Sequence, residues 1–129
     1  MNRVDVMDLI VVDLEATCWD TPRPRNHMEI IEIGAVRLDA ELTVVDEFDC
    51  FVRPVVGPKL SQFCTALTTI KQADVDEADM FPAVFARFIE WIGDGPYRLC
   101  SWASLTSVSF GWTALGSAWC FPSSSRVTT

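Results

Sequence analysis

A short apolar run near the start of the chain constrains the fold more than any other feature. Residues 7–13 read Met-Asp-Leu-Ile-Val-Val-Asp, in which apolar and β-branched side chains follow one another without strict alternation. Such a run is typical of a strand that is buried on both faces. We therefore expect a first strand here, inside a fold that mixes strands and helices.

The hydrophobic pattern predicts the other elements. Residues 39–42 are expected to form a hairpin turn between two strands. A helix is expected where apolar residues recur with helical spacing, with Pro82 in its first turn and Gly93 after its end, and we expect its apolar face to lie in the core. The expected elements are strands at 29–38, 44–52 and 98–102, helices at 61–67 and 81–92, and a loop at 70–78. This order predicts a mixed α/β fold.

Composition narrows the class of protein. The chain has 129 residues, of which half are apolar and 22% are charged, so we expect one folded domain. Its apolar runs are short or broken by charges, and we expect no membrane partner and a cytoplasmic location. Five cysteines without a C-x-x-C pair favour free thiols and no disulfide-linked partner. The net charge of −8 argues against a basic nucleic-acid-binding surface, but it leaves a metal site open.

The charges are distributed unevenly along the chain. Residues 1–103 hold all 18 acidic side chains, whereas residues 104–129 hold one charge, Arg126, and eleven serines and threonines. A polar disordered tail is one interpretation of this change. The tail nevertheless carries aromatic side chains that linkers usually lack, namely Phe110, Trp112, Trp119 and Phe121.

Two carboxylates follow the first strand at a spacing that suits metal binding. Asp13 and Glu15 are two residues apart, so in extended structure both side chains point to one face. Carboxylate oxygens are the ligands that Mg²⁺ and Mn²⁺ prefer, and a cation would offset their mutual repulsion. A pair of solvated acids at a strand end is the alternative, and it is common in acidic proteins.

Several ordered motifs resemble the DEDDh family of 3′-to-5′ exonucleases. They are the run Val-Asp-Leu-Glu-Ala-Thr-Cys-Trp at 12–19, the run Glu-Ile-Ile-Glu-Ile-Gly-Ala-Val at 29–36, and Phe-Val-Arg-Pro at 51–54. The run Pro-Lys-Leu-Ser-Gln-Phe-Cys-Thr at 58–65 is similar to the branch that contains the histone-mRNA 3′ exonuclease and its bacterial relatives. The resemblance covers about residues 8–103.

The resemblance implies a fold and a set of site residues. The fold would be a ribonuclease-H-like mixed sheet with flanking helices, truncated at its C-terminal side. Asp13 and Glu15 would be catalytic metal ligands for Mg²⁺ or Mn²⁺, with two ions in the intact family. The residues expected to contact the 3′-terminal nucleotide are Ala16, Thr17, Trp19 and Phe63. The alternative to nucleotide contact is that Trp19 and Phe63 are packed aromatic side chains. His27 is expected to be solvated.

The family pattern stops near residue 104. An aspartate is expected just after Ser104, where this chain has Leu105 and Thr106, and no Asp, Glu or His follows residue 106. A two-base shift in a permitted coding sequence for residues 105–116 would instead read Asp-Gln-Arg-Gln-Phe. We therefore divide the chain into residues 1–104, the N-terminal portion of an exonuclease domain, and residues 105–129, an atypical tail that a frameshift would explain. Without the helices of the missing part, the apolar surface at Val11, Ile31, Ile33 and Phe88 is expected to be partly exposed.

The expected function is metal-dependent 3′-to-5′ exonuclease activity on the 3′ ends of RNA or single-stranded DNA, releasing nucleoside 5′-monophosphates. With Asp13 and Glu15 alone, we expect weak metal binding and impaired catalysis. The alternative is a domain of the same fold that binds nucleic acid or another partner without cleaving it.

Overall fold

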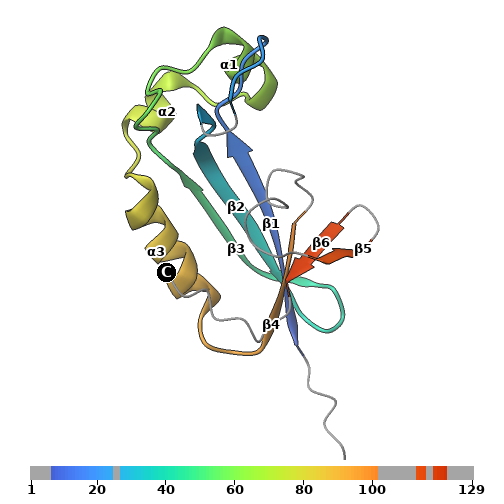
Figure 1. Ribbon diagram of the computed structural model, residues 1–129. Coiled ribbons are helices and arrows are strands. Elements are labelled where there is room, and N and C mark those ends of the chain that lie inside the picture. The colour runs from blue at the N-terminus through green and yellow to red at the C-terminus, as the bar shows by residue number, and fades with distance from the viewer. Residues whose placement is uncertain (1–6, 25–26, 102–112, 116–117, 122–129) are drawn as a thin grey trace, which may run out of the picture. The chain divides into compact units, whose positions relative to one another are not determined.

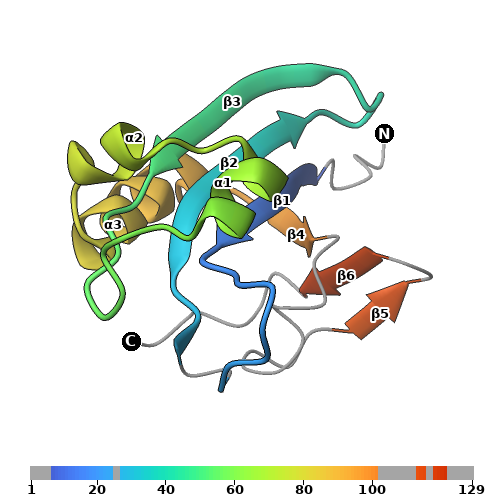
Figure 2. The same cartoon turned by 90° about the horizontal axis from the view of Figure 1, so that it is seen from above.

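A mixed β-sheet organises the computed structural model, which describes residues 7–24 and 27–101 and the backbone of 113–115 and 118–121. Within that part of the chain the strand order is β3-β2-β1-β4-β6-β5, and β4 pairs parallel to β1 (Figures 1 and 2). The strands are β1 (Asp8–Ala16), β2 (Ile30–Leu38), β3 (Val44–Phe51), β4 (Tyr97–Ser101), β5 (Thr113–Leu115) and β6 (Ala118–Phe121). The expected mixed α/β sheet is confirmed.

Strands β1 and β2, which lie inside the sheet, bury alternate side chains. In β1, Ile10 is fully buried and Val12 is 5% exposed, and β1 continues three residues beyond the predicted run. In β2, every second side chain is buried, namely Ile31, Ile33 and Ala35. Burial of alternate β-branched side chains is what stabilises a pleated strand.

Strand β3 lies at one end of the strand order and is mostly exposed. The turn that joins it to β2 was predicted at 39–42 and is confirmed, since Leu42 N–H donates to the Asp39 carbonyl at 3.0 Å. The Asp39 carboxylate also accepts the N–H groups of Glu41 and Thr43 at 2.9 and 3.0 Å. These bonds hold Leu42 at a φ of 62°, a conformation that most side chains avoid.

Three helices lie between β3 and β4 in the sequence: α1 (Gln62–Thr68), α2 (Gln72–Asp76) and α3 (Phe81–Ile92). The bounds of α3 are those the apolar spacing predicted. Its buried stripe is narrower than expected, because only Val84, Phe88 and Ile92 are buried, whereas Phe81 and Ile89 are 39% and 43% exposed. Those three buried residues are four apart, so they form a single row along the helix.

The segment predicted as a loop at 70–78 contains helix α2, so that prediction was wrong. Lys71 N–H donates to the Asp74 carboxylate at 3.0 Å, which caps the helix. Gln72 fixes the helix to the preceding loop, because its amide donates to the Pro58 carbonyl and accepts the Leu60 N–H, both at 2.8 Å. A five-residue helix is too short to show an apolar period, so these distant bonds define it.

A core cluster joins β2 to the first two helices. Ile31, Cys64, Ile70 and Val75 are each at most 4% exposed, and Cys18, Phe51 and Leu60 pack against them. The predicted partial exposure was wrong for Ile31, Ile33 and Phe88, whose exposed fractions are 0%, 2% and 5%, whereas Val11 is half-buried.

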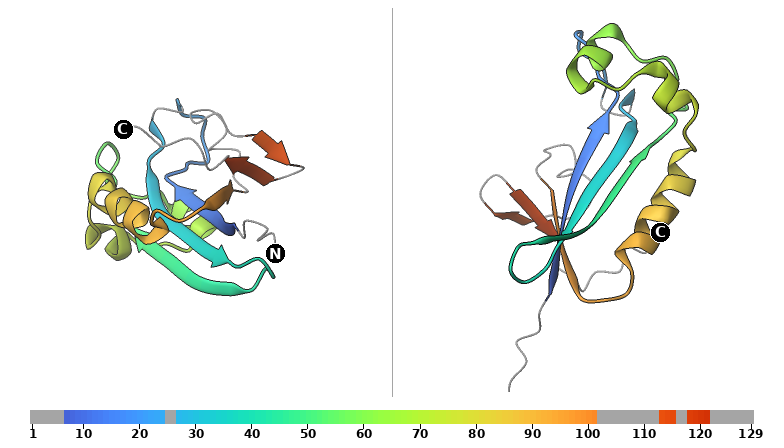
Figure 3. Two further views of the ribbon diagram at one scale, coloured as in Figure 1. Left: turned by 90° about the horizontal axis from the view of Figure 1, so that it is seen from below. Right: turned by 180° about the vertical axis from the view of Figure 1, so that it is seen from behind.

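The described chain divides into two compact units. One contains residues 14–33 and 49–91, with α1, α2 and the core cluster around Ile31. The other contains residues up to 13, residues 34–48 and the chain from 92 onward, with the β4–β6–β5 arrangement (Figure 3). None of the helices in the described ranges has the length and apolar character needed to cross a membrane.

One cysteine departs from the expected free thiols. Cys18, Cys50 and Cys64 are free, but Cys100 is disulfide-bonded. The antiparallel register of β4 and β6 sets Cys100 opposite Cys120 along the backbone. Two cysteines twenty residues apart give no sequence motif, so only this register brings their backbones together.

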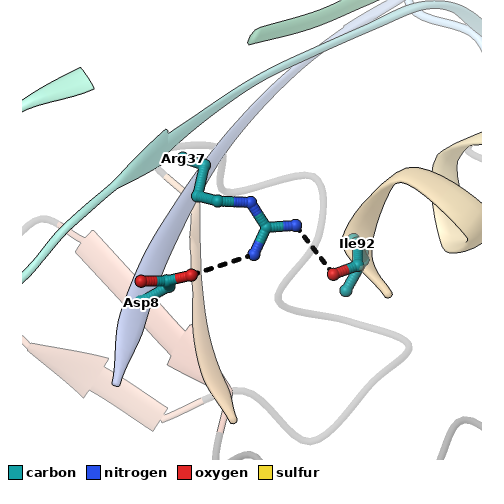
Figure 4. A network of polar contacts seen from close by, with 3 residues as sticks. All are labelled: Asp8, Arg37 and Ile92. Carbon is teal, nitrogen blue, oxygen red and sulfur yellow. Dashed lines mark hydrogen bonds and ion pairs between the residues drawn. The ribbon is translucent and has the colours of Figure 1, made fainter. Parts of the chain in front are cut away.

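An arginine connects three parts of the second unit (Figure 4). The Arg37 guanidinium donates to the Asp8 carboxylate at 3.2 Å and to the Ile92 carbonyl at 2.7 Å. The Arg37 side chain is only 16% exposed. It thus provides a donor for a carbonyl in the last turn of α3, and its ion pair links β2 to the start of β1.

We expect Arg37→Ala to destabilise the chain by about 1 to 2 kcal/mol, because it leaves a partly buried carboxylate and a helix-end carbonyl without this donor. Urea unfolding would measure the change. The matched control is Arg87→Ala, whose ion pair with Asp79 joins side chains that are 50% and 61% exposed; its cost should stay below about 0.5 kcal/mol. Equal losses in the two variants would contradict this account.

Candidate metal and nucleotide site

Strand β1 carries both of the predicted metal ligands. Asp13 and Glu15 lie two residues apart within β1, so they share one face of the strand. Asp13 is exposed and Glu15 is half-buried. The buried side chains Ile10 and Val12 occupy the alternate positions, whereas Leu9 and Val11, on the same face as the carboxylates, are half-buried.

The parallel strand β4 ends beside this pair. The register places Val12 opposite Ser101, so β4 ends next to the position that precedes Asp13. The carboxyl ends of parallel strands meet at one edge of a sheet, and polar site residues often gather there. The family position just after Ser104, where this chain has Leu105 and Thr106, lies outside the described residues.

The two carboxylates suit a hard divalent cation that takes only one or two of its ligands from the protein. Mg²⁺ is usually held by one or two carboxylates, with water and substrate phosphates completing its shell. Asp13 and Glu15 provide that number of carboxylates. In the ranges 7–24 and 27–101, no group of three or more His, Cys, Asp or Glu side chains could hold a metal ion. The residues therefore fit one ion that shares its ligands with a phosphate.

The chain after β1 is fixed to β2 through Thr17. Thr17 N–H donates to the Glu29 carbonyl at 2.8 Å, and Glu29 N–H donates to the Thr17 hydroxyl at 2.9 Å. Thr17 is 3% exposed. Of the predicted nucleotide contacts, Thr17 thus has its hydroxyl engaged inside the protein, whereas Ala16 beside it is half-buried.

The Glu29 side chain organises the loop after β3. Its carboxylate accepts the N–H groups of Val55, Val56 and Gly57 at distances from 2.7 to 3.1 Å. Burial alone would raise the pKa of Glu29, but these three donors outweigh it, and the pKa lies below its ordinary value of 4.5. Glu29 is therefore ionised at neutral pH and holds the loop as an acceptor.

Helix α1 is attached to the same segment by its first residues. The Ser61 hydroxyl donates to the Cys18 carbonyl at 2.7 Å and accepts the Cys64 N–H at 3.0 Å, so it caps α1 while binding the chain after β1. The Cys64 thiol points to the Ala16 carbonyl at 3.8 Å. Phe63 lies between these two anchors and is 41% exposed, so it is not the packed aromatic of the alternative interpretation.

Trp19 is half-buried and carries a cation on its ring. The Arg23 guanidinium carbon lies 5.0 Å from the ring centroid, a distance at which the ring face attracts a positive charge. Arg23 is exposed. His27, predicted to be solvated, is exposed as expected.

The Cys18 thiol near the site is held in its protonated form. Burial raises the pKa of Cys18 to about 11, with further contributions from the Cys64 thiol and from the charge of Glu15. A thiol with that pKa is protonated at neutral pH, so it is a poor nucleophile. The chemistry of this region rests on oxygen donors.

Sequence reasoning missed three residues of this region. Ser61 was assigned to the helix it precedes, although a serine before a helix is a standard cap signal. Glu29 gave no local signal, because its partners lie 26 to 28 residues away. Arg23 gave no signal in the sequence, since only the folded chain shows it against Trp19.

Glu29→Gln should lower stability at neutral pH by about 1 kcal/mol, because an amide oxygen replaces a charged acceptor for three donors. The folded-state pKa is lowered, so the stability from ionised Glu29 is complete well above pH 4.5 and is lost as the pH falls through the folded value. The variant should thus lose less stability than the unaltered chain between neutral and acidic pH. Urea unfolding across that pH range measures the stability of the unaltered chain, of Glu29→Gln and of the control Glu90→Gln, which changes an exposed side chain. Parallel curves of stability against pH for all three proteins would contradict the prediction.

Comparison with known proteins shows which family this chain resembles. The model of a family described as exonuclease matches residues 10–99. Human ERI1 exoribonuclease 2 is 44% identical over 85 residues, which are 65% of this chain and 12% of that protein. Human 3′-5′ exoribonuclease 1 is 41% identical over 85 residues, which are 65% of this chain and 24% of that protein. The chain thus spans less than a quarter of the length of either relative.

Solved structures agree with the sequence relatives. The nuclease domain of 3′hExo, described as a DEDDh family member bound to rAMP, superposes with a TM-score of 0.74 at 34% identity, covering 83% of this chain and 57% of that one. A 3′-exonuclease recognising the histone mRNA stem-loop superposes with a TM-score of 0.71 at 35% identity, covering 77% and 47%. The fold is therefore ribonuclease-H-like, and the chain belongs to the exonuclease family, as a member of its DEDDh 3′-to-5′ group.

Proposed function

We propose that this chain acts on the 3′ ends of RNA as a metal-dependent 3′-to-5′ exonuclease. The observation that carries the proposal is the pair of carboxylates on one face of β1, Asp13 and Glu15, followed directly by the segment whose Cys18 carbonyl accepts the Ser61 hydroxyl. Hard carboxylate ligands and an exposed aromatic ring are what phosphodiester hydrolysis at a single-stranded end requires. The product would be a nucleoside 5′-monophosphate.

Asp13 and Glu15 would hold Mg²⁺ or Mn²⁺, of which the family uses two. When bound, the cation would activate water and offset charge at phosphorus. The protein's own part is to hold two carboxylates on one rigid strand and to keep the neighbouring thiol of Cys18 protonated. Because Asp13 is exposed, a phosphate of the substrate can reach an ion that it binds.

The substrate class follows from the rings and from the relatives. Phe63 is 41% exposed in the first turn of α1, and stacking on such a ring contributes about 1 to 3 kcal/mol per base without sequence preference. Trp19 supplies a second ring, and Ala16 and Thr17 form the stretch of chain that leads to it. One similar structure is described as recognising a histone mRNA stem-loop and another as bound to rAMP. Single-stranded DNA is a second substrate that stacking alone would admit.

A specific observation favours binding without efficient cleavage as the second candidate function. The described residues bring together two carboxylates and no third metal-binding side chain, and the sequence has no Asp, Glu or His after residue 106. We therefore propose weak metal affinity and slow hydrolysis for these 129 residues. We propose a cytoplasmic location, which the free thiols Cys18, Cys50 and Cys64 favour and the disulfide-bonded Cys100 does not.

A 5′-labelled single-stranded RNA tests the two functions together. With Mn²⁺ we expect binding by anisotropy and at most slow shortening from the 3′ end on a denaturing gel. Asp13→Asn should remove any shortening and weaken Mn²⁺ binding at least about tenfold, since it deletes one of two charged ligands. Asp46→Asn, an exposed acid on β3, is the control with the same change of charge.

The outcomes separate the candidates. Shortening that Asp13→Asn abolishes supports the exonuclease, and binding without shortening supports the second function. Phe63→Ala should weaken RNA binding about fivefold or more in either case. Retention of both activities in Asp13→Asn would contradict the assignment of the metal ligands.

The division at residue 104 is also a proposal. We propose that residues 1–104 form the exonuclease portion and that residues 105–129 arise from a shifted reading frame. The nucleotide sequence downstream of codon 104 should then encode an aspartate followed by the remaining family motifs in another frame. A gene without such a reading frame would contradict the frameshift and leave the assignment of Asp13 and Glu15 intact.

A further inference from the structure

The loop after Trp19 presents a cation in an unusual setting. Arg23 is exposed, and its guanidinium lies over the Trp19 ring, 5.0 Å from the centroid. Arginine binds aromatic faces through its planar, weakly hydrated guanidinium, and it keeps its edge donors available while it does so. The ring therefore orients the guanidinium without using its hydrogen-bond donors.

The backbone around Arg23 is restricted before any ligand arrives. Pro22 and Pro24 flank it, so the φ angle of each neighbour is fixed, and the residue before a proline is confined to extended conformations. His27 N–H donates to the Pro24 carbonyl at 3.0 Å and closes the loop. Little conformational entropy is left to lose when Arg23 binds a ligand, which favours affinity.

Arg23 differs from the arginines that form ion pairs. Arg37 pairs with Asp8 and Arg87 pairs with Asp79. Neither of these ion pairs, which are the ones found in the described residues, involves Arg23. What distinguishes Arg23 is its position over the Trp19 ring, which leaves the edge donors of the guanidinium available to an external anion.

The position of Arg23 links it to the proposed site. Trp19 follows Cys18, whose carbonyl accepts the Ser61 hydroxyl, and Ser61 caps the helix that carries Phe63. The Ser61 hydroxyl thus joins the segment that precedes Trp19 to the helix that carries the exposed Phe63. An aromatic ring beside an arginine is the combination by which proteins hold single strands, with stacking for bases and charge for phosphates.

We propose that Arg23 is a phosphate-binding residue for single-stranded nucleic acid, held in position by Trp19. The guanidinium edge binds a backbone phosphate of the strand whose 3′ end lies at Asp13 and Glu15. The inference rests on the proposed function for the location of the strand end. It assigns to the loop at 20–24 a role in binding that is independent of the metal.

Salt-dependent binding in EDTA tests this role, because no metal and no cleavage enter the measurement. Anisotropy of a short, labelled, single-stranded RNA is followed from about 50 to about 300 mM salt for the unaltered chain and for Arg23→Ala. Loss of one phosphate contact should reduce the slope of log Kobs against log salt by about 0.7. Affinity at the lowest salt should fall about threefold to tenfold.

Two further variants separate the charge from the ring. Arg23→Lys keeps the charge and should retain most of the slope, with weaker binding because the planar stack is lost. Trp19→Ala removes the support and should weaken binding at every salt concentration, with a smaller change in slope than Arg23→Ala. Arg87→Ala is the control for net charge, since Arg87 is paired with Asp79; it should leave slope and affinity unchanged. Thermal melts verify that each variant is folded.

The results distinguish this inference from the proposed function. If Arg23→Ala and Arg87→Ala both bind like the unaltered chain, the inference is wrong, while the nuclease and Mn²⁺ measurements still decide the proposed function. If the two variants lose affinity equally, the effect is one of net charge and the inference is wrong as well. If the unaltered chain shows no salt-dependent binding in EDTA, the inference is wrong, while the Mn²⁺ measurements still decide the proposed function.

Discussion

The backbone after β1 sets the condition on which the site depends. Where a strand leaves its sheet, its N–H and carbonyl groups need new partners, because unpaired polar groups inside a protein are costly. Three bonds meet that need: Thr17 N–H to the Glu29 carbonyl, Glu29 N–H to the Thr17 hydroxyl, and the Ser61 hydroxyl to the Cys18 carbonyl. The same bonds fix the position of every predicted nucleotide contact.

Local signals predicted the larger part of the fold. The apolar run at 7–13, the turn at Asp39 and the helical spacing at 81–92 each carry their cause in neighbouring residues, and each element was found. The shared face of Asp13 and Glu15 also follows from the two-residue period of a strand. What depends on a short sequence window was open to prediction.

Features that depend on distant partners could not be predicted from the sequence. Helix α2 is defined by Gln72, which binds the loop at Pro58, and the state of Cys100 accompanies the pairing of β4 with β6. The exposure of Phe63 and of Ile89 likewise depends on which neighbours cover each helix. Periodicity marks side chains that share a helical face, but it does not say how wide the buried stripe will be.

The edge strand β3 has a consequence for behaviour in concentrated solution. Within the part of the chain that the structure describes, β3 is the last strand of the order on its side, and its exposed Val44 and Val45 would offer another copy a template for strand pairing. The same strand carries Asp46, Glu47 and Asp49, so two such edges brought together would align like charges at neutral pH. The acidity of the chain thus doubles as protection against edge-to-edge aggregation, and that protection weakens as carboxylates are neutralised.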